Sequence, residues 1–278
     1  MPSFDTPEPI SVTLEFDIGT ARITASKRTD AIVEVLPSNG ADDADVRAAQ
    51  QTEVTCSGGR LLVKGPKKHS PFGKSGSVDV SIELPTDSDV HGTSPMADFT
   101  CEGRLGECRL KTSAGGIRVG EAATVRVQTD HGDVRVDRVT GDAEVTGSGR
   151  IVIGEIGGAA TVDNLNGETV IGEVTGELRA NSTDGQISVG VAHAGVDATS
   201  AHGGIRIGEA VRGLITLQTA VGDLEVGVRE STAARFEADT QLGSVHHALE
   251  QVEGPEAFDE IVEIRARTAT GDIVIRRP

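Results

Sequence analysis

Hydrophobic and polar residues alternate in a short pattern that recurs through the last two thirds of the chain. A glycine is followed two residues later by a residue that is usually branched and apolar, then by any residue, then by a second apolar residue. Alternation of this kind is typical of short, half-buried β-strands, and a recurring period predicts a stacked array of repeats. Nine copies are present, and their first apolar positions are 17 to 28 residues apart. These positions are Ile117, Val134, Ile151, Thr169, Ile187, Ile205, Leu224, Val245 and Ile273.

A second alternating set lies in each repeat, for example Val196, Ala198 and Ser200. Its third residue is nearly always Thr, Ser or Asn, which predicts a column of hydrogen-bonding side chains at one corner. Each repeat therefore has two strands and two corners in about 18 residues. We expect an all-β fold, a β-solenoid or β-helix-like stack. An N-terminal β-rich segment (1–99) would pack on or cap the array (100–278).

The first 99 residues alternate as well and add one helix. Strands are expected in 10–36 with a turn at Gly19-Thr20, in a hairpin over 54–63, and in 77–84. The polar, alanine-rich stretch 42–51 predicts a short helix with Asp42 or Asp43 as its N-cap.

Composition narrows the range of functions. The chain has six Phe but no Trp or Tyr, so its core must consist of thin aliphatic layers. Its net charge of −17 argues against binding to nucleic acid or electrostatic docking on anionic lipid. No apolar run is long enough to span a membrane, and residues 1–10 have neither the basic nor the apolar region of a secretory signal. These features predict a cytoplasmic protein that does not insert into membranes.

The strongest candidates for interaction are charged residues outside the stacking pattern. Acidic residues follow the first strand of many repeats, and in register they would form a column that could bind a basic partner or, weakly, a cation. A basic Gly/Pro-rich loop at 64–76 could bind an acidic partner. The acidic candidates are Glu121, Asp137, Glu155, Glu173 and Glu209, and the basic ones are Lys64, Lys67, Lys68 and Lys74. The alternative is that the acids are solvated corner residues with occasional arginine partners.

No pattern predicts catalysis, a cofactor or a metal site. The seven His do not share a position in the repeat, and no nucleotide-binding or nucleophile motif occurs in a suitable context. Carbohydrate-active β-helices need aromatic platforms, which are missing here. Cys56, Cys101 and Cys108 are expected to be reduced.

The chain resembles the DUF4097 family, also called the toastrack domain and "putative adhesin". The matching stretches are 14–23, 77–85, 101–112 and the repeats, and the chain looks especially like actinobacterial members of the cytoplasmic type. The resemblance implies a β-helical or roll-like domain, often linked to cell-envelope stress, with no agreed activity or cofactor.

Three functions remain open at this point. We expect a non-enzymatic scaffold that binds a protein partner or itself. A bactofilin-like cytoplasmic polymer and, less favoured, a carbohydrate-active enzyme are the alternatives. Polymerisation needs an open end strand, whereas the final strand, followed by Arg276, Arg277 and Pro278, is expected to form a blunted edge.

Overall fold

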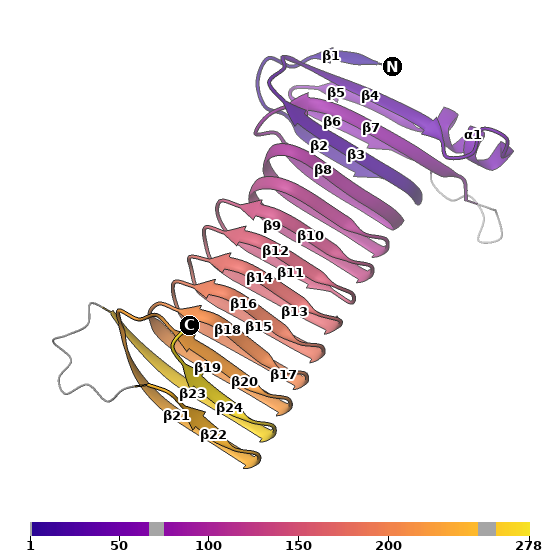
Figure 1. Cartoon of the computed structure of the whole chain (residues 1–278). Coiled ribbons are helices and arrows are strands. Elements are labelled where there is room, and N and C mark those ends of the chain that lie inside the picture. Colours follow the sequence, from indigo (N-terminus) through magenta and orange to yellow (C-terminus); the bar gives the residue numbers. More distant parts are fainter. Residues whose placement is uncertain (1, 67–74, 250–259) are drawn as a thin grey trace. The chain divides into compact units, whose positions relative to one another are not determined.

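Short parallel strands stacked in register make up most of the protein. The computed structural model describes residues 2–66, 75–249 and 260–278, and within them the protein is almost entirely β-sheet with one helix (Figure 1). The predicted all-β solenoid fold is confirmed. The residues form two compact units, Met1–Arg138 and Val139–Pro278. The predicted division at residue 99 remains a prediction.

The N-terminal unit combines a parallel core with antiparallel outer strands. β2 lies between β6 and β8, and β3 lies between β7 and β8, all in parallel. β4 is antiparallel to β7 and to the short β1, and β5 is antiparallel to β6. The strands are β1 (Ser3–Asp5), β2 (Ser11–Glu15), β3 (Ile18–Ser26), β4 (Asp30–Pro37), β5 (Glu53–Ser57), β6 (Arg60–Lys64), β7 (Ser77–Pro85), β8 (Asp89–Ala114), β9 (Ile117–His131) and β10 (Val134–Val139), of which β10 runs through the boundary between the units.

Local sequence explains the helix and the hairpin of this unit. Helix α1 (Asp43–Gln51) begins after Asp42, whose side chain accepts a hydrogen bond from the Ala44 N–H at 2.8 Å, as an N-cap does. Gly58 and Gly59, both with positive φ, form the two-residue turn between β5 and β6. The predicted turn at Gly19-Thr20 is wrong, because both residues lie in β3 and the chain turns at Phe16-Asp17.

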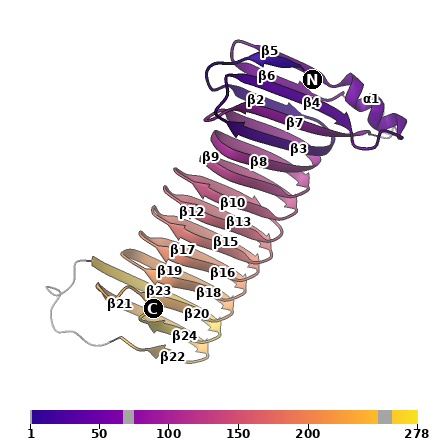
Figure 2. The same cartoon turned by 45° about the horizontal axis from the view of Figure 1, so that its top comes forward.

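The C-terminal unit is a stack of two-strand turns. Each strand pairs in parallel with the equivalent strand of the neighbouring turn, for example β15 with β13 and β17 (Figure 2). Its strands are β11 (Ala143–Gly147), β12 (Ile151–Ile156), β13 (Ala160–Asn166), β14 (Thr169–Val174), β15 (Leu178–Asp184), β16 (Ile187–Ala192), β17 (Val196–His202), β18 (Ile205–Ala210), β19 (Gly213–Val221), β20 (Leu224–Val228), β21 (Thr232–Leu242), β22 (Val245–His247), β23 (Glu260–Thr270) and β24 (Ile273–Arg276).

The last two turns do not stack in the order of the sequence. β23 pairs with β19 on one side and β21 on the other, and β24 lies between β20 and β22. Figures 1 and 2 both show β23 and β24 inserted in this way. The end turn of the unit is therefore β21/β22. The expectation that the final strand forms the edge of the stack is wrong.

The predicted corner column is present and joins successive turns. The Thr219 hydroxyl donates to the Gly203 carbonyl at 3.0 Å, and the Asn164 amide donates to the carbonyls of Gly149 and Gly167, each at 3.0 Å. Glycine is required at this corner. Gly203 has φ +146°, and a Cβ there would lie 2.2 Å from the Gly185 carbonyl oxygen of the preceding turn. Thr219 and Asn164 are thus used in stacking.

Candidate interaction surfaces

The predicted acidic column is only partly continuous in the C-terminal unit. We call Glu155, Glu173 and Glu209 the acidic row. Glu155 lies directly opposite Glu173 in the β12–β14 ladder. Glu173 lies opposite Val191, which lies opposite Glu209, so an apolar residue interrupts the row. The repulsion between stacked carboxylates is therefore limited to one adjacent pair.

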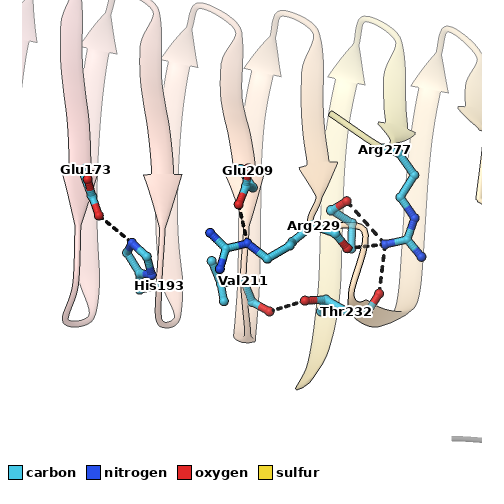
Figure 3. Close-up of polar contacts among 8 residues, drawn as sticks. Glu173, His193, Glu209, Val211, Arg229, Thr232 and Arg277 are labelled. Atoms are coloured by element: carbon cyan, nitrogen blue, oxygen red, sulfur yellow. Dashed lines mark hydrogen bonds and ion pairs between the residues drawn. The ribbon is translucent and has the colours of Figure 1, made fainter. Parts of the chain in front are cut away.

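Basic residues of neighbouring turns contact the acidic row. Glu173 Oε1 lies 2.7 Å from His193 Nε2, and Glu209 accepts a hydrogen bond from Arg229 Nε (Figure 3). Glu155 also has an interaction partner. These contacts favour the alternative in which the acids are solvated corner residues with basic partners. Binding of a cation or basic protein to the row remains a prediction.

The other two acidic candidates lie in the N-terminal unit. Asp137 Oδ1 is 2.9 Å from Arg135 Nε on the same strand. Glu121 lies opposite Arg104 in the β8–β9 pair. The hydrogen bond to Asp87 is the main reason that the pKa of Arg104 is raised, and the negative charge of Glu121 contributes in the same direction. Both carboxylates therefore lie next to arginine rather than in an uninterrupted anionic strip.

The basic loop is described only at its two ends, 64–66 and 75–76. Lys64 ends β6, and its Nζ lies 3.6 Å from Glu15 Oε2, a partly exposed pair. Lys67, Lys68 and Lys74 lie outside the described residues. The role of the loop as a binding site remains a prediction.

An open groove of about 550 Å³ lies on the C-terminal unit and was not predicted. It crosses four consecutive strands, β13, β15, β17 and β19, near the points where they begin. Ala159 has only a methyl side chain and Gly195 has none, and Leu214 adds an exposed apolar residue. Arg179 and Asp197 add an ion pair of 3.4 Å. The residues that face outward here follow no repeat, so the periodic pattern gave no signal for them.

The C-terminal arginines fix the inserted turn instead of blunting an edge. Arg277 donates hydrogen bonds to the carbonyls of Val228, Arg229 and Thr232, at the corner that joins β20 to β21 (Figure 3). Arg276 forms an ion pair of 2.7 Å with Glu225. These contacts attach the final strand to both neighbouring turns. The end of the stack is left to β21 and β22.

No reactive centre stands out in the described part of the chain. The cysteines are free, as expected, and a hydrogen bond with Cys101 together with burial raises the pKa of the Cys108 thiol well above its ordinary value. Nowhere in 2–66, 75–249 or 260–278 do three His, Cys, Asp or Glu side chains gather closely enough to hold a metal ion.

Hydropathy gives one further result. The single helix found among the described residues is too short and polar to cross a membrane.

The fold and its surfaces define a β-repeat protein whose turns stack in parallel and present outward-facing side chains. The family description "Toastrack DUF4097" matches residues 12–276, and the chain therefore belongs to this family. The resemblance seen in the sequence is confirmed. A search of curated proteins finds no match.

Solved structures that match the chain share little sequence with it. A "putative adhesin" from Bacteroides fragilis is 12% identical, with a TM-score of 0.38, over 99% of this chain and 95% of that one. A "putative adhesin" from Parabacteroides merdae is 11% identical, with a TM-score of 0.34, over 100% and 95%. A "putative cell adhesion protein" from Clostridium sporogenes is 11% identical, with a TM-score of 0.25, over 100% and 98%.

The prediction of a cytoplasmic protein is wrong. Four matching structures are described as adhesins or cell adhesion proteins, a class that is usually extracellular or exposed at the cell surface. The prediction rested on two absences, of a long apolar run and of a secretory signal in residues 1–10, and such absences do not fix a compartment.

Proposed function

We propose that the protein is a non-enzymatic β-repeat scaffold that binds a protein partner in the groove across β13, β15, β17 and β19. The observation that carries this proposal is the groove itself, about 550 Å³ in volume, where outward-facing side chains such as Arg179 and Asp197 lie beside buried core residues of the strands. An array of this kind is well suited to present an extended surface.

The chemistry of the groove fits an extended protein segment. Ala159 and Gly195 leave room for a backbone to approach, while Leu214, 42% exposed, offers an apolar contact. The Arg179–Asp197 pair is more than half exposed, with side chains 66% and 52% accessible. Because exposed ion pairs contribute little to stability, both groups can exchange partners when a ligand arrives.

The acidic row is a less favoured docking surface. A basic partner would have to compete with His193 for Glu173 and with Arg229 for Glu209. The groove requires the exchange of only one exposed pair. A role in cell-envelope stress rests on family membership, and its test is whether expression rises when the source organism is exposed to inhibitors of wall synthesis.

Affinity capture tests the groove. The purified protein is immobilised and exposed to separate surface and soluble fractions of the source organism, and bound proteins are identified by mass spectrometry. Leu214→Asp should remove the specific partner, whereas Leu165→Asp, at an exposed leucine outside the groove lining, should retain it. Equal capture by both variants, or turnover of a polysaccharide substrate, would contradict the proposal.

A further inference from the structure

Within the described residues, the end turn of the C-terminal unit has one edge without a partner strand. Among the described residues, β21 pairs only with β23, and β22 pairs only with β24. β21 is 11 residues long. A strand with one paired edge leaves a row of N–H and C=O groups available for another strand.

The core face of this turn is exposed as well. Phe236 and Val245 are each 38% exposed, although the residues opposite them in the next turn, Ile264 and Ile273, are fully buried. The rings of Phe236 and His247 lie 5.1 Å apart across the turn. Apolar side chains that are buried in every neighbouring turn are therefore left half covered at this end.

The charged residues of β21 are arranged so that two antiparallel copies of the strand would place opposite charges face to face. Arg235 and Glu237 lie on either side of Phe236 and are both exposed. Glu237 forms a loose pair of 3.4 Å with Arg267, whereas Arg235 has no ion-pair partner among the residues that the structure describes. A strand that carries opposite charges at equal distances from one residue can pair with an antiparallel copy of itself about that residue.

We propose that the protein forms a two-fold symmetric homodimer in which β21 pairs antiparallel with β21 of a second copy, centred on Phe236. In this register Arg235 of each copy lies opposite Glu237 of the other, and Ala234 lies opposite Ala238. This surface is separate from the groove, so the inference goes beyond the proposed function.

The charges select this register over its neighbours. If the two-fold axis passed through Glu237, the Glu237 carboxylates of the two copies would face each other. If it passed through Ala238, Glu237 of one copy would face Asp239 of the other. A shift by one residue would oppose core-facing and solvent-facing side chains, which sheet pairing disfavours. Because Phe236 contacts His247 across the turn, the same two-fold axis brings β22 to β22 of the second copy.

The pairing closes at two copies. A two-fold interface uses the same surface on both partners and leaves no edge for a third chain. The outer strands of the N-terminal unit, β1 and β5, are only three and five residues long, and such short edges are poor templates for further pairing. We therefore expect dimers and not the filament of the polymer alternative.

Charge exchange provides the first test, read by sedimentation velocity over a wide concentration range. The wild-type protein should sediment as a dimer that dissociates on dilution. Arg235→Glu and Glu237→Arg should each weaken self-association about tenfold or more, because like charges then face each other. An equimolar mixture of the two variants should recover the dimer, since opposite charges face again. Arg179→Glu, in the groove, should not affect dimerisation.

A cross-link tests the register. In a Cys56→Ala background, Phe236→Cys places two cysteines opposite each other at the axis. Directly opposed antiparallel residues have Cα atoms about 4.5–5.5 Å apart, within disulfide range. Mild oxidation should give a covalent dimer. Leu242→Cys, which this register places opposite Glu230, should not cross-link to itself.

Four results of these experiments would contradict the proposed dimer. A wild-type protein that stays monomeric at every concentration, or that grows beyond two copies, contradicts the closed pairing. An unchanged dimer in both charge variants, or a mixture that fails to associate, contradicts the antiparallel register. Dimers that survive Leu214→Asp while partner capture is lost show that the two surfaces act independently.

Discussion

The inner turns and the end turn of the C-terminal unit carry the same pattern but differ in burial. In the inner β17, Val196, Ala198 and Ser200 are all buried. In the end strand β21, the equivalent residues 236, 238 and 240 are partly or largely exposed. The comparison teaches that the pattern sets the direction of each side chain, whereas burial requires a turn on both sides.

The largest effect should come from breaking the close contact between inner turns. Gly203→Ala would place a Cβ 2.2 Å from the Gly185 carbonyl oxygen at φ +146°. We expect a loss of about 3 kcal/mol or more in the free energy of unfolding, measured by urea denaturation. Gly40→Ala is the control, because an added Cβ there would have no atom within 4 Å other than those of its chain neighbours. It should change stability by less than about 0.5 kcal/mol. Similar losses for the two variants would contradict this account.

Matched valine substitutions measure burial directly. Val226, in an inner turn, is fully buried, and Val245, in the end turn, is 38% exposed. Val226→Ala should destabilise the protein by about 2–3 kcal/mol, because it removes buried methyl groups and leaves a cavity. Val245→Ala should cost less than about 1 kcal/mol. Thermal and urea unfolding of both variants would check the difference, and equal costs would show that the end turn is covered in solution.

Two neighbouring corner positions sharpen the comparison within the inner turns. The Asn164 amide bonds three groups, the carbonyls of Gly149 and Gly167 and the Thr169 hydroxyl. The Ser182 hydroxyl is buried without a partner among the described residues. Asn164→Ala should cost about 2 kcal/mol.

Ser182→Ala should be neutral or slightly stabilising, because it removes a buried polar group that makes no hydrogen bond. The same unfolding measurements apply to both corner variants. A loss at Ser182 as large as that at Asn164 would mean that the serine hydroxyl is bonded in solution.

A small effect should also lie on the outward faces of the turns, where charge pairs are solvated. Burial alone would raise the pKa of Glu107, but its hydrogen bonds with His91 and Arg109 outweigh burial and lower it. A lowered pKa in the folded state stabilises the protein above the unfolded pKa, and this stabilisation is lost as the pH falls through the folded pKa. Glu107→Gln should therefore cost about 0.5 kcal/mol at neutral pH and nothing in strong acid. A cost that persists in acid would contradict the role of charge.

The sequence predicted the features that repeat, because stacking imposes them on every turn. The strand pairs and the corner residues such as Thr219 follow from a period of about 18 residues. The order of the last two turns could not be read from that period, because β21 and β23 carry the same alternation. Their register places Arg235, Glu237 and Asp239 opposite Glu263, Arg265 and Arg267, a match of opposite charges that selects the pair. The longer final interval, 28 residues, was the available signal.

The candidate surfaces were predicted less well than the fold. The acids were expected after the first strand of each repeat, whereas Glu155, Glu173 and Glu209 lie within β12, β14 and β18. Val191 in the row and the basic partners His193 and Arg229 depend on how turns align across space. The groove near Leu214 is formed by outward residues that differ from turn to turn. Such residues carry no period, so their grouping appears only when the strands are stacked.

The inserted turn has a consequence for the order in which the protein folds. Inner turns can form as they leave the ribosome, because each stacks on a turn already made. β21 and β22 cannot, since the surface on which they stack, β23 and β24, is synthesised after them. Completion of the unit must wait for residues 260–276, and until then an 11-residue strand is left without its partner. If translation stopped before residue 260, β23 and β24 would be missing, and β21 and β22 would lack the strands on which they stack.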